Sequence, residues 1–238
     1  MKYNECKVLC KLERKKEPLV SIVPVDEYTD MVQNNFDYDF TGESIFYPYE
    51  LPKEFEKLNY SILVITGSSG GGKSTLLKEF PFYYKQHKKY DCTKAIVSNF
   101  SSPEEASIRL SAVGLNSMPV WCRPRNVLSV GEGFRADLAL NINSEMIFDE
   151  FTSTIDRNVA KSTCNSIAKF IRKNNMNHIV FCSCHNDYIP FLKPDFVIDI
   201  DEGKCFDCRD ADLGEALRSK STSQPTKRFG AFLSNITI

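Results

Sequence analysis

The sequence predicts an α/β fold in which a mainly parallel sheet forms the core. Short apolar runs rich in β-branched residues recur along the chain, and helical segments with polar faces separate them. Strands that alternate with helices in this way are typical of a parallel sheet with right-handed crossovers. The chain has 238 residues, of which 42% are hydrophobic and 26% charged, so it can bury a domain core and is not mainly disordered.

The N-terminal part of the chain predicts antiparallel strands at the edge of the fold. Residues 7–12 and 19–25 are rich in β-forming residues and flank a charged stretch, so we expect two edge strands joined by a loop. Residues 34–60 are rich in aromatic side chains and contain Pro48 and Pro52. We therefore expect irregular structure there, leading into the core.

The remaining elements alternate regularly. The continuous apolar run at residues 61–66 is typical of a strand that is buried on both faces of a parallel sheet. Further strands are expected at residues 95–98, 145–149, 178–183 and 196–200, and helices at residues 74–80, 103–113, 133–141 and 156–173. We expect one domain over residues 1–210, with a small helical subdomain at about 101–143, and a mobile polar extension over residues 211–238.

A glycine-rich loop lies between the first core strand and the first core helix. It matches the pattern G-x-x-x-x-G-K-[ST] over Gly67, Ser68, Ser69, Gly70, Gly71, Gly72, Lys73, Ser74 and Thr75. Glycines let successive backbone N–H groups turn toward phosphate oxygens, and the helix N-terminus behind them adds positive charge. Lys73 can reach the β- and γ-phosphates of a nucleotide, and the Ser74 hydroxyl can join a Mg²⁺ shell. A flexible linker does not usually lie between a buried strand and a helix, so the sequence predicts a phosphate-binding loop.

Two acidic residues end the strand expected at residues 145–149. Asp149 offers the oxygen ligands that Mg²⁺ prefers, and Glu150 is placed to orient or deprotonate an attacking water. A strand that ends in a charged turn would look the same when taken alone. The phosphate loop upstream favours the functional interpretation, because the two features together are typical of nucleotide hydrolysis.

Three further segments resemble motifs of ATP-binding-cassette (ABC) ATPases. Residues 149–156, DEFTSTID, resemble their D-E-P-T-S-A-L-D segment. Residues 128–132, LSVGE, are similar to their L-S-G-G-Q signature, and residues 184–187, CHND, resemble their switch-histidine motif. With the phosphate loop, these motifs stand in the family's order and cover residues 62 to about 200. Residues 101–156 are similar to a soluble branch whose members are often fused to an acetyltransferase-like domain.

In ABC ATPases two copies face each other head to tail and enclose two ATP molecules. The resemblance implies that Ser129 and Gly131 of one copy meet the γ-phosphate held by the loop of the other, and that Asp156 couples the two sites. Two positions depart from the signature, since Val130 replaces a glycine and Glu132 replaces a glutamine.

The resemblance also implies roles in catalysis and metal binding. Glu150 would activate water, His185 would contact the γ-phosphate, and Lys73 would bind the phosphates during the reaction. The implied metal ligands are Ser74, Asp149 and Asn99, the last of which stands where the family has a glutamine. The aromatic residue that stacks on adenine is Phe46, Tyr47 or Tyr49, and the sequence leaves this choice open.

The implied function is Mg²⁺-dependent hydrolysis of ATP by a homodimer that forms on ATP binding. We expect a soluble clamp or motor that acts on a macromolecular partner, either nucleic acid or protein. The alternative is the nucleotide-binding subunit of an ABC transporter with separate membrane subunits, which the short helical region and Asn99 disfavour. A phosphotransferase is disfavoured by the signature-like residues 128–132 and by His185, and Glu150 argues against a module that binds ATP without hydrolysing it.

Charge and cysteine content limit the setting of the protein. Thirty basic and 31 acidic residues give a formal charge of −1, so no global basic excess argues for nucleic acid. The apolar stretches are far shorter than the roughly 20 residues of a membrane span, and the charged start argues against an export signal. We therefore expect a cytoplasmic protein without membrane insertion, in which the nine cysteines are reduced.

Two weaker patterns have two interpretations each. Cys205 and Cys208 have the spacing of half a zinc site, but core or surface thiols are the favoured interpretation. Residues 83–90 interleave tyrosine and lysine as nucleic-acid surfaces do, and a solvated face is favoured because the net charge is near zero.

Overall fold

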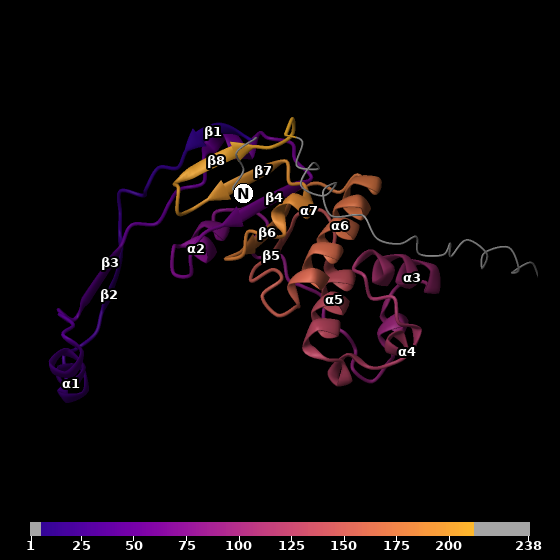
Figure 1. Cartoon of the computed structure of the whole chain (residues 1–238), viewed down its shortest axis with the longest axis horizontal. Coiled ribbons are helices and arrows are strands. Elements are labelled where there is room, and N and C mark those ends of the chain that lie inside the picture. The colour runs from indigo at the N-terminus through magenta and orange to yellow at the C-terminus, as the bar shows by residue number, and fades with distance from the viewer. Residues whose placement is uncertain (1–5, 212–238) are drawn as a thin grey trace, which may run out of the picture.

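The computed structural model describes residues 6–211, so the mobile extension predicted at residues 211–238 lies outside it except for Ala211. The main sheet has the strand order β1–β8–β7–β4–β6–β5 (Figure 1). These strands are β1 (Lys7–Lys11), β8 (Lys204–Asp207), β7 (Phe196–Asp199), β4 (Ile62–Thr66), β6 (Ile179–Ser183) and β5 (Met146–Phe148). β4 runs parallel to β6 and β7, and β5 runs parallel to β6, whereas β8 is antiparallel to both β7 and β1. The predicted α/β fold with a mainly parallel core and N-terminal antiparallel strands is confirmed, although β8 was not predicted.

The strands predicted from apolar runs form the buried centre of this sheet. Every residue of β4, β6 and β7 is buried. Alternate side chains of β4 point to opposite faces, so Ile62 and Val64 join one apolar cluster while Leu63 and Ile65 join another. Burial on both faces explains why this run contains no charged residue.

Helices cover the two faces of the sheet. The second apolar cluster includes residues of α2 (Lys73–Leu77), and the first includes residues of α6 (Arg157–Lys173) and α7 (Ile189–Leu192). A small helical subdomain extends the first cluster, as predicted. It contains α3 (Pro103–Ala112), α4 (Met118–Trp121) and α5 (Val130–Asn141). Short 3₁₀ helices complete the fold at η1 (Lys53–Glu56), η2 (Ile96–Asn99) and η3 (Arg125–Val127).

The strand predicted at residues 95–98 is wrong, because this segment forms η2. Ile96 is fully buried, which accounts for the apolar run. Its N–H donates to the carbonyl of Arg123 at 2.9 Å and not to a strand of the sheet. Residues 95–97 are therefore apolar because they pack in the helical subdomain, and not because they form a strand of the sheet.

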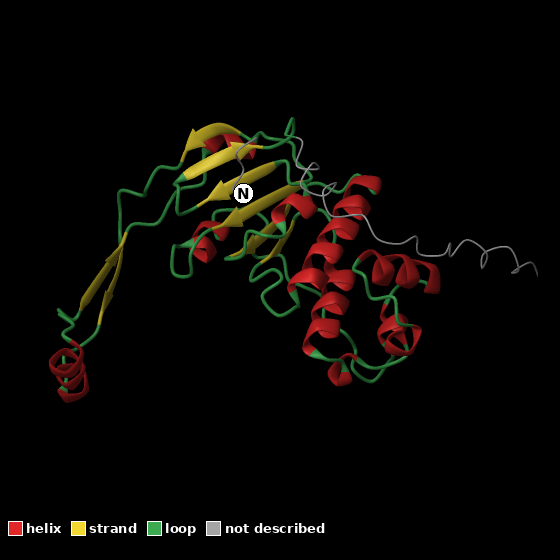
Figure 2. Ribbon diagram, viewed as in Figure 1, coloured by secondary structure: helices red, strands yellow, loops and turns green. Residues whose placement is uncertain are grey.

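Residues 19–46 leave the main sheet as a separate arm, which Figure 2 shows projecting from one side of the molecule. β2 (Leu19–Ile22) and β3 (Glu43–Phe46) pair with each other in a two-stranded sheet, and α1 (Glu27–Phe36) lies between them in the sequence, at the far end of the arm. The strand predicted at residues 19–25 therefore exists, but its place at the edge of the main fold is wrong. The irregular structure expected over residues 34–60 is also wrong in part, since β3, η1 and the end of α1 lie there.

The pairing of β1 with β8 brings four cysteines together in two pairs. Cys6 and Cys208 form a disulfide, so the expectation that all nine cysteines are reduced is wrong for this pair. Cys10 lies opposite Cys205 in the same ladder. Cys208 belongs to the first apolar cluster and Cys205 to the second, because side chains alternate along a strand. These two cysteines therefore face opposite sides of the sheet and do not act as the two adjacent ligands of one metal.

Among the helices of residues 6–211, none combines the length and the apolar character that a bilayer span requires.

Candidate functional site

The glycine-rich loop lies between β4 and α2, as the sequence predicts. Gly67, Gly70 and Gly72 have φ values of 142°, 79° and 95°, a region that side-chain-bearing residues rarely adopt, so glycine forms this loop without strain. The space beside Gly72 is also closed, because an added Cβ would lie 2.6 Å from Cζ of Phe46. Phe46 is the last residue of β3, so the root of the arm touches the phosphate loop.

Lys73 opens α2, and its side chain folds back over the loop. Its ammonium group donates to the carbonyl oxygens of Gly67 at 2.9 Å and Ser68 at 2.7 Å, and the residue is buried. A buried ammonium requires such acceptors because desolvation of its charge is costly. The positive charge is therefore fixed inside the loop that is predicted to bind phosphate.

A carboxylate that the sequence analysis missed holds the start of the loop. Asp201 accepts hydrogen bonds from the Ser68 N–H at 2.9 Å and from the Ser68 hydroxyl at 2.8 Å. The two residues are 133 positions apart, so no local motif signals the contact. It arises because β7, just before Asp201, pairs in parallel with β4, just before the loop.

A hydrogen bond joins the loop to the end of β5. The Ser74 hydroxyl donates to Oδ2 of Asp149 at 2.9 Å. β4 and β5 both run parallel to β6, so their carboxyl ends reach the same edge of the sheet. Mg²⁺ prefers oxygen ligands, so the Ser74 hydroxyl and the Asp149 carboxylate fit the predicted ion.

Glu150 turns the chain sharply just after Asp149. Its φ is 51°, a conformation that is strained for a residue with a side chain. Its N–H donates to Oδ1 of Asp149 at 2.9 Å, and its carbonyl accepts from the hydroxyl of Ser153 at 2.7 Å. These bonds hold the strained turn and leave the Glu150 residue exposed beside the predicted metal ligand.

A cysteine lies beneath the two acidic residues. Burial raises the pKa of the Cys182 thiol, and the Asp149 carboxylate beside it raises this pKa further. The raised pKa favours the protonated thiol at neutral pH, which is a weaker nucleophile than a thiolate. Cys182 is therefore a buried, uncharged residue next to Asp149.

The signature-like segment lies at the start of α5, on the helical subdomain and apart from α2 (Figure 1). Ser129 is the N-cap of α5, and its hydroxyl accepts the N–H of Glu132 at 3.4 Å. Glu132 reaches back and accepts the Ser129 N–H at 3.0 Å and its hydroxyl at 2.8 Å. This arrangement is a capping box, which the spacing of a serine and a glutamate three residues later signals in the sequence. Hydrogen bonds from Ser129 hold the pKa of Glu132 below its ordinary value. Gly131 lies in the first turn, where an added Cβ would be 3.4 Å from Ile155.

His185 follows β6 and therefore lies at the same sheet edge as the phosphate loop. Its backbone N–H donates to the Ser183 hydroxyl at 3.2 Å. The side-chain oxygen of the next residue, Asn186, accepts a hydrogen bond from the Thr66 hydroxyl of β4. Asp187 forms an ion pair with Arg157 of α6. Partial burial tends to raise the pKa of Asp187, but the hydrogen bond and the charge of Arg157 outweigh it and hold this pKa below its ordinary value.

Two other predicted residues serve local roles in this structure. Asp156 is the N-cap of α6 and accepts the N–H groups of Asn158 at 2.8 Å and Val159 at 3.3 Å. The side-chain oxygen of Asn99 accepts the N–H of Asp91 at 2.7 Å. Asn99 thus braces the loop that precedes η2, and one of the two lone pairs of its side-chain oxygen accepts this bond.

The three aromatic candidates for adenine stacking have different surroundings. The guanidinium of Arg14 lies 4.3 Å from the centre of the Tyr49 ring, so one face of that ring is occupied. Tyr47 is exposed, and its carbonyl accepts a hydrogen bond from Arg14 at 2.6 Å. Phe46 contacts the glycine-rich loop, through Gly72.

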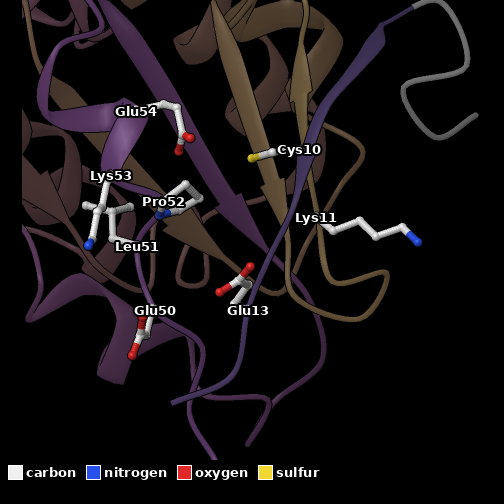
Figure 3. A pocket seen from close by; sticks show the side chains of 8 residues that line it. All are labelled: Cys10, Lys11, Glu13, Glu50, Leu51, Pro52, Lys53 and Glu54. Atoms are coloured by element: carbon white, nitrogen blue, oxygen red, sulfur yellow. The ribbon is translucent and has the colours of Figure 1, made fainter. Parts of the chain in front are cut away.

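A separate hollow of about 510 Å³ lies between β1 and residues 50–54, which lead into and begin η1. Figure 3 shows the side chains that line it. Its lining includes Cys10, Glu13, Glu50 and Glu54, and no residue of the phosphate loop lines it. Burial raises the pKa of the Cys10 thiol, and the nearby Glu54 carboxylate adds to the effect. Two lysines, Lys11 and Lys53, also line the hollow, so its lining has three acidic and two basic residues.

Comparison with known proteins assigns no family. No model of a protein family matches the chain, and a search of curated proteins finds no match. Among solved structures, the chain is similar to the dimeric structure of MJ0796, described as a bacterial ABC transporter cassette. The two share 14% sequence identity and a TM-score of 0.47, over 68% of this chain and 89% of that chain. The case for a function therefore rests on the residues and contacts described above.

Proposed function

We propose that this chain is an ABC-type ATPase that binds ATP with Mg²⁺ and hydrolyses it to ADP and phosphate. The observation that carries the proposal is the 2.9 Å hydrogen bond between Ser74 of the glycine-rich loop and Asp149 at the end of β5. It joins a phosphate loop and a metal-binding carboxylate at one sheet edge, which is the arrangement that phosphoryl transfer to water requires. The order of the motifs in the sequence supports the same function.

The loop would supply the phosphate site. Backbone N–H groups of residues 67–75 would bind phosphate oxygens, and Lys73 would exchange its two carbonyl acceptors for them. Ser74 and Asp149 would hold Mg²⁺, which neutralises charge on the phosphate oxygens when it is bound. Asn99 would be a further metal ligand, through the lone pair of its side-chain oxygen that does not accept the Asp91 N–H.

Glu150 and His185 are the proposed catalytic residues for the attack of water. Glu150 follows the metal-binding Asp149 and is exposed, so its carboxylate can accept a proton from a water beside the γ-phosphate. His185 lies at the same edge of the sheet, because β6 pairs with β4 up to the residue before the loop. It can donate a hydrogen bond to the γ-phosphate and orient the same water.

We propose that two copies close on ATP in a head-to-tail sandwich. Ser129 and Gly131 of one copy would cap the γ-phosphate held by the other, and Asp156 would contact the partner across the interface. For Ser129 to do this, its hydroxyl must leave Glu132, which binds it at 2.8 Å in this structure. A phosphate oxygen would take the place of the Glu132 carboxylate as acceptor, and both are negatively charged, so one charge-assisted hydrogen bond would replace another.

The clamp or motor function and the cytoplasmic setting are part of the proposal, as is the assignment of residues 1–210 to the ATPase domain. They are supported by the resemblance of residues 101–156 to the soluble branch of the family. Turnover that nucleic acid stimulates would favour the clamp. Copurification with a polytopic membrane protein would instead favour the transporter subunit.

The decisive experiment is the variant Glu150→Gln. It should bind Mg·ATP as the wild type does, but its turnover should fall by roughly 10²–10⁴-fold, the usual contribution of a general base. Gel filtration with ATP at high salt should show a dimer that retains ATP, since buried phosphate contacts are little screened by salt. The matched control is Glu145→Gln, an exposed glutamate before β5, which should keep full turnover. Normal turnover in Glu150→Gln, or a monomer that releases ATP, would count against the mechanism.

A further inference from the structure

The arm, residues 19–46, exposes an unusual amount of apolar surface. None of the residues of α1 is buried. Twelve of the nineteen large hydrophobic side chains that are exposed within residues 6–211 lie on the arm or on the adjoining Tyr47. On α1 the apolar residues Tyr28, Met31, Val32 and Phe36 recur at the spacing of one helix face. A ten-residue helix and a two-stranded sheet are marginally stable alone in water, so this surface is suited to contact with a partner.

The arm is also uniformly acidic, which restricts the kind of partner that it fits. It contains six acidic residues and no lysine, arginine or histidine. The acidic residues are Asp26, Glu27, Asp30, Asp37, Asp39 and Glu43. Removing these six from the 31 acidic residues of the chain leaves 25, against all 30 basic residues. The rest of the chain therefore has the opposite charge balance, and a second copy of the same protein offers a complementary surface.

One segment of the body combines the charge and the apolar character that the arm requires. The basic segment, residues 84–89, contains three lysines and no acidic residue, and all six of its residues are exposed. Lys85 pairs with Glu145 of the same copy, so Lys88 and Lys89 supply the charge that the arm would meet. It begins with Tyr84, which is 81% exposed and is the most exposed of the large hydrophobic residues of the structure. This segment is part of the lysine- and tyrosine-rich pattern for which the proposed ATPase mechanism has no use.

We propose that the arm of one copy docks on the basic segment of a second copy, and that two such contacts form a two-fold dimer without nucleotide. The root of the arm and the basic segment start from neighbouring parts of the molecule. Phe46 at the root contacts Gly72, the N-cap of α2, and the chain continues from α2 to Tyr84. In Figure 1, α2 lies on the side of the sheet from which the arm projects. Reciprocal exchange of arms around a two-fold axis can therefore satisfy both contacts at once.

Sedimentation velocity of the full chain without nucleotide tests this proposal. At low salt the wild type should sediment with twice the 27.1 kDa mass of the chain. Added salt should dissociate this dimer, because the screening length falls from about 10 Å at 0.1 M to about 3 Å at 1 M. The arm variant Glu27→Lys/Asp30→Lys and the body variant Lys88→Glu/Lys89→Glu should each weaken the dimer by roughly tenfold or more. The combined four-residue variant should recover the dimer, because the two charges are then exchanged.

Two controls make the outcome specific. Lys169→Glu/Lys173→Glu changes an equal number of exposed lysines on α6 and should leave the dimer intact. Tyr28→Ser/Phe36→Ser keeps the charge of the arm but should also weaken the dimer. A monomeric wild type at low salt would overturn the proposal and assign the arm to a different protein. A dimer that survives both charge reversals, or that is not recovered by their combination, would overturn it equally. All variants should still bind Mg·ATP, so a failure here is distinguishable from a failure of the ATPase proposal.

Discussion

Replacing Gly72 by alanine tests the contact between the arm and the phosphate loop. Gly72 has a φ of 95°, and an added Cβ would lie 2.6 Å from Cζ and 3.1 Å from Cε1 of Phe46. The substitution therefore has two effects. It strains the backbone of residue 72, which has a positive φ, and it displaces the ring of Phe46. The end of a phenylalanine ring can move, so we expect Phe46 to swing away from the loop.

The magnitude follows from these two effects. A non-glycine residue at positive φ is destabilised by about 1–2 kcal/mol. Phe46 is half-buried, so displacing its ring loses about 1 kcal/mol of the roughly 1.5–3 kcal/mol that full burial of a large apolar side chain provides. Gly72→Ala should therefore lower the free energy of unfolding by about 2–3 kcal/mol. In a Phe46→Ala background only the backbone strain remains, so Gly72→Ala should lower the free energy of unfolding by about 1–2 kcal/mol.

Urea unfolding of the four proteins in this double-mutant cycle provides the measurement. Far-UV circular dichroism follows the whole fold, and the fluorescence of Trp121, the only tryptophan, follows the helical subdomain. Gly72→Ala should be less harmful in the Phe46→Ala background than in the wild type. Equal losses in both backgrounds, within about 0.5 kcal/mol, would show that the ring does not rest on the loop and would refute the reasoning.

Three further predictions follow from the helical subdomain and the sheet edge. Ser129→Arg should prevent the ATP-dependent dimer in gel filtration at high salt, where the arm-mediated dimer is dissociated, and titration with a fluorescent nucleotide should show unchanged Mg·ATP affinity. An ATP-dependent dimer that persists at high salt would contradict the role of Ser129 at the γ-phosphate. Gly133→Ala should displace the Arg125 guanidinium, because an added Cβ would lie 2.3 Å from its Nη1, and should weaken its ion pair with Asp137. The loss of about 0–1 kcal/mol for this partly exposed pair and the gain of up to about 1 kcal/mol in helix propensity oppose each other, so the free energy of unfolding should change by less than about 1 kcal/mol. A loss of about 3 kcal/mol in urea unfolding would show that the guanidinium cannot move. Asp187→Asn should lower the free energy of unfolding at neutral pH and have little effect in acid. A carboxylate with a depressed pKa stabilises the fold above its ordinary pKa, and this stabilisation is lost as the pH falls through its folded pKa. A difference between variant and wild type that does not change with pH would disprove the role of the ion pair.

The features that were predicted correctly are those that a short stretch of sequence specifies. β4 is a continuous apolar run, and the glycine-rich loop after it is a contiguous motif. The wrong strand at residues 95–98 shows the limit of such patterns. Ile96 and its neighbours are apolar because the helical subdomain buries them, and an apolar run does not distinguish that burial from a place in the sheet.

By itself, the sequence determined the place of the glycine-rich loop between a buried strand and a helix, and most of the alternation of strands and helices, because backbone chemistry and hydrophobic periodicity act over a few residues. Only the tertiary structure decided which distant residues meet. The Ser74–Asp149 bond, the hold of Asp201 on Ser68, and the pairing of Cys6 with Cys208 all depend on which strands lie side by side. The position of the arm is also decided by the tertiary structure, because the pattern of residues in β2 does not specify the strand with which it pairs. Strand order is set by packing of the whole chain, and no local spacing records it.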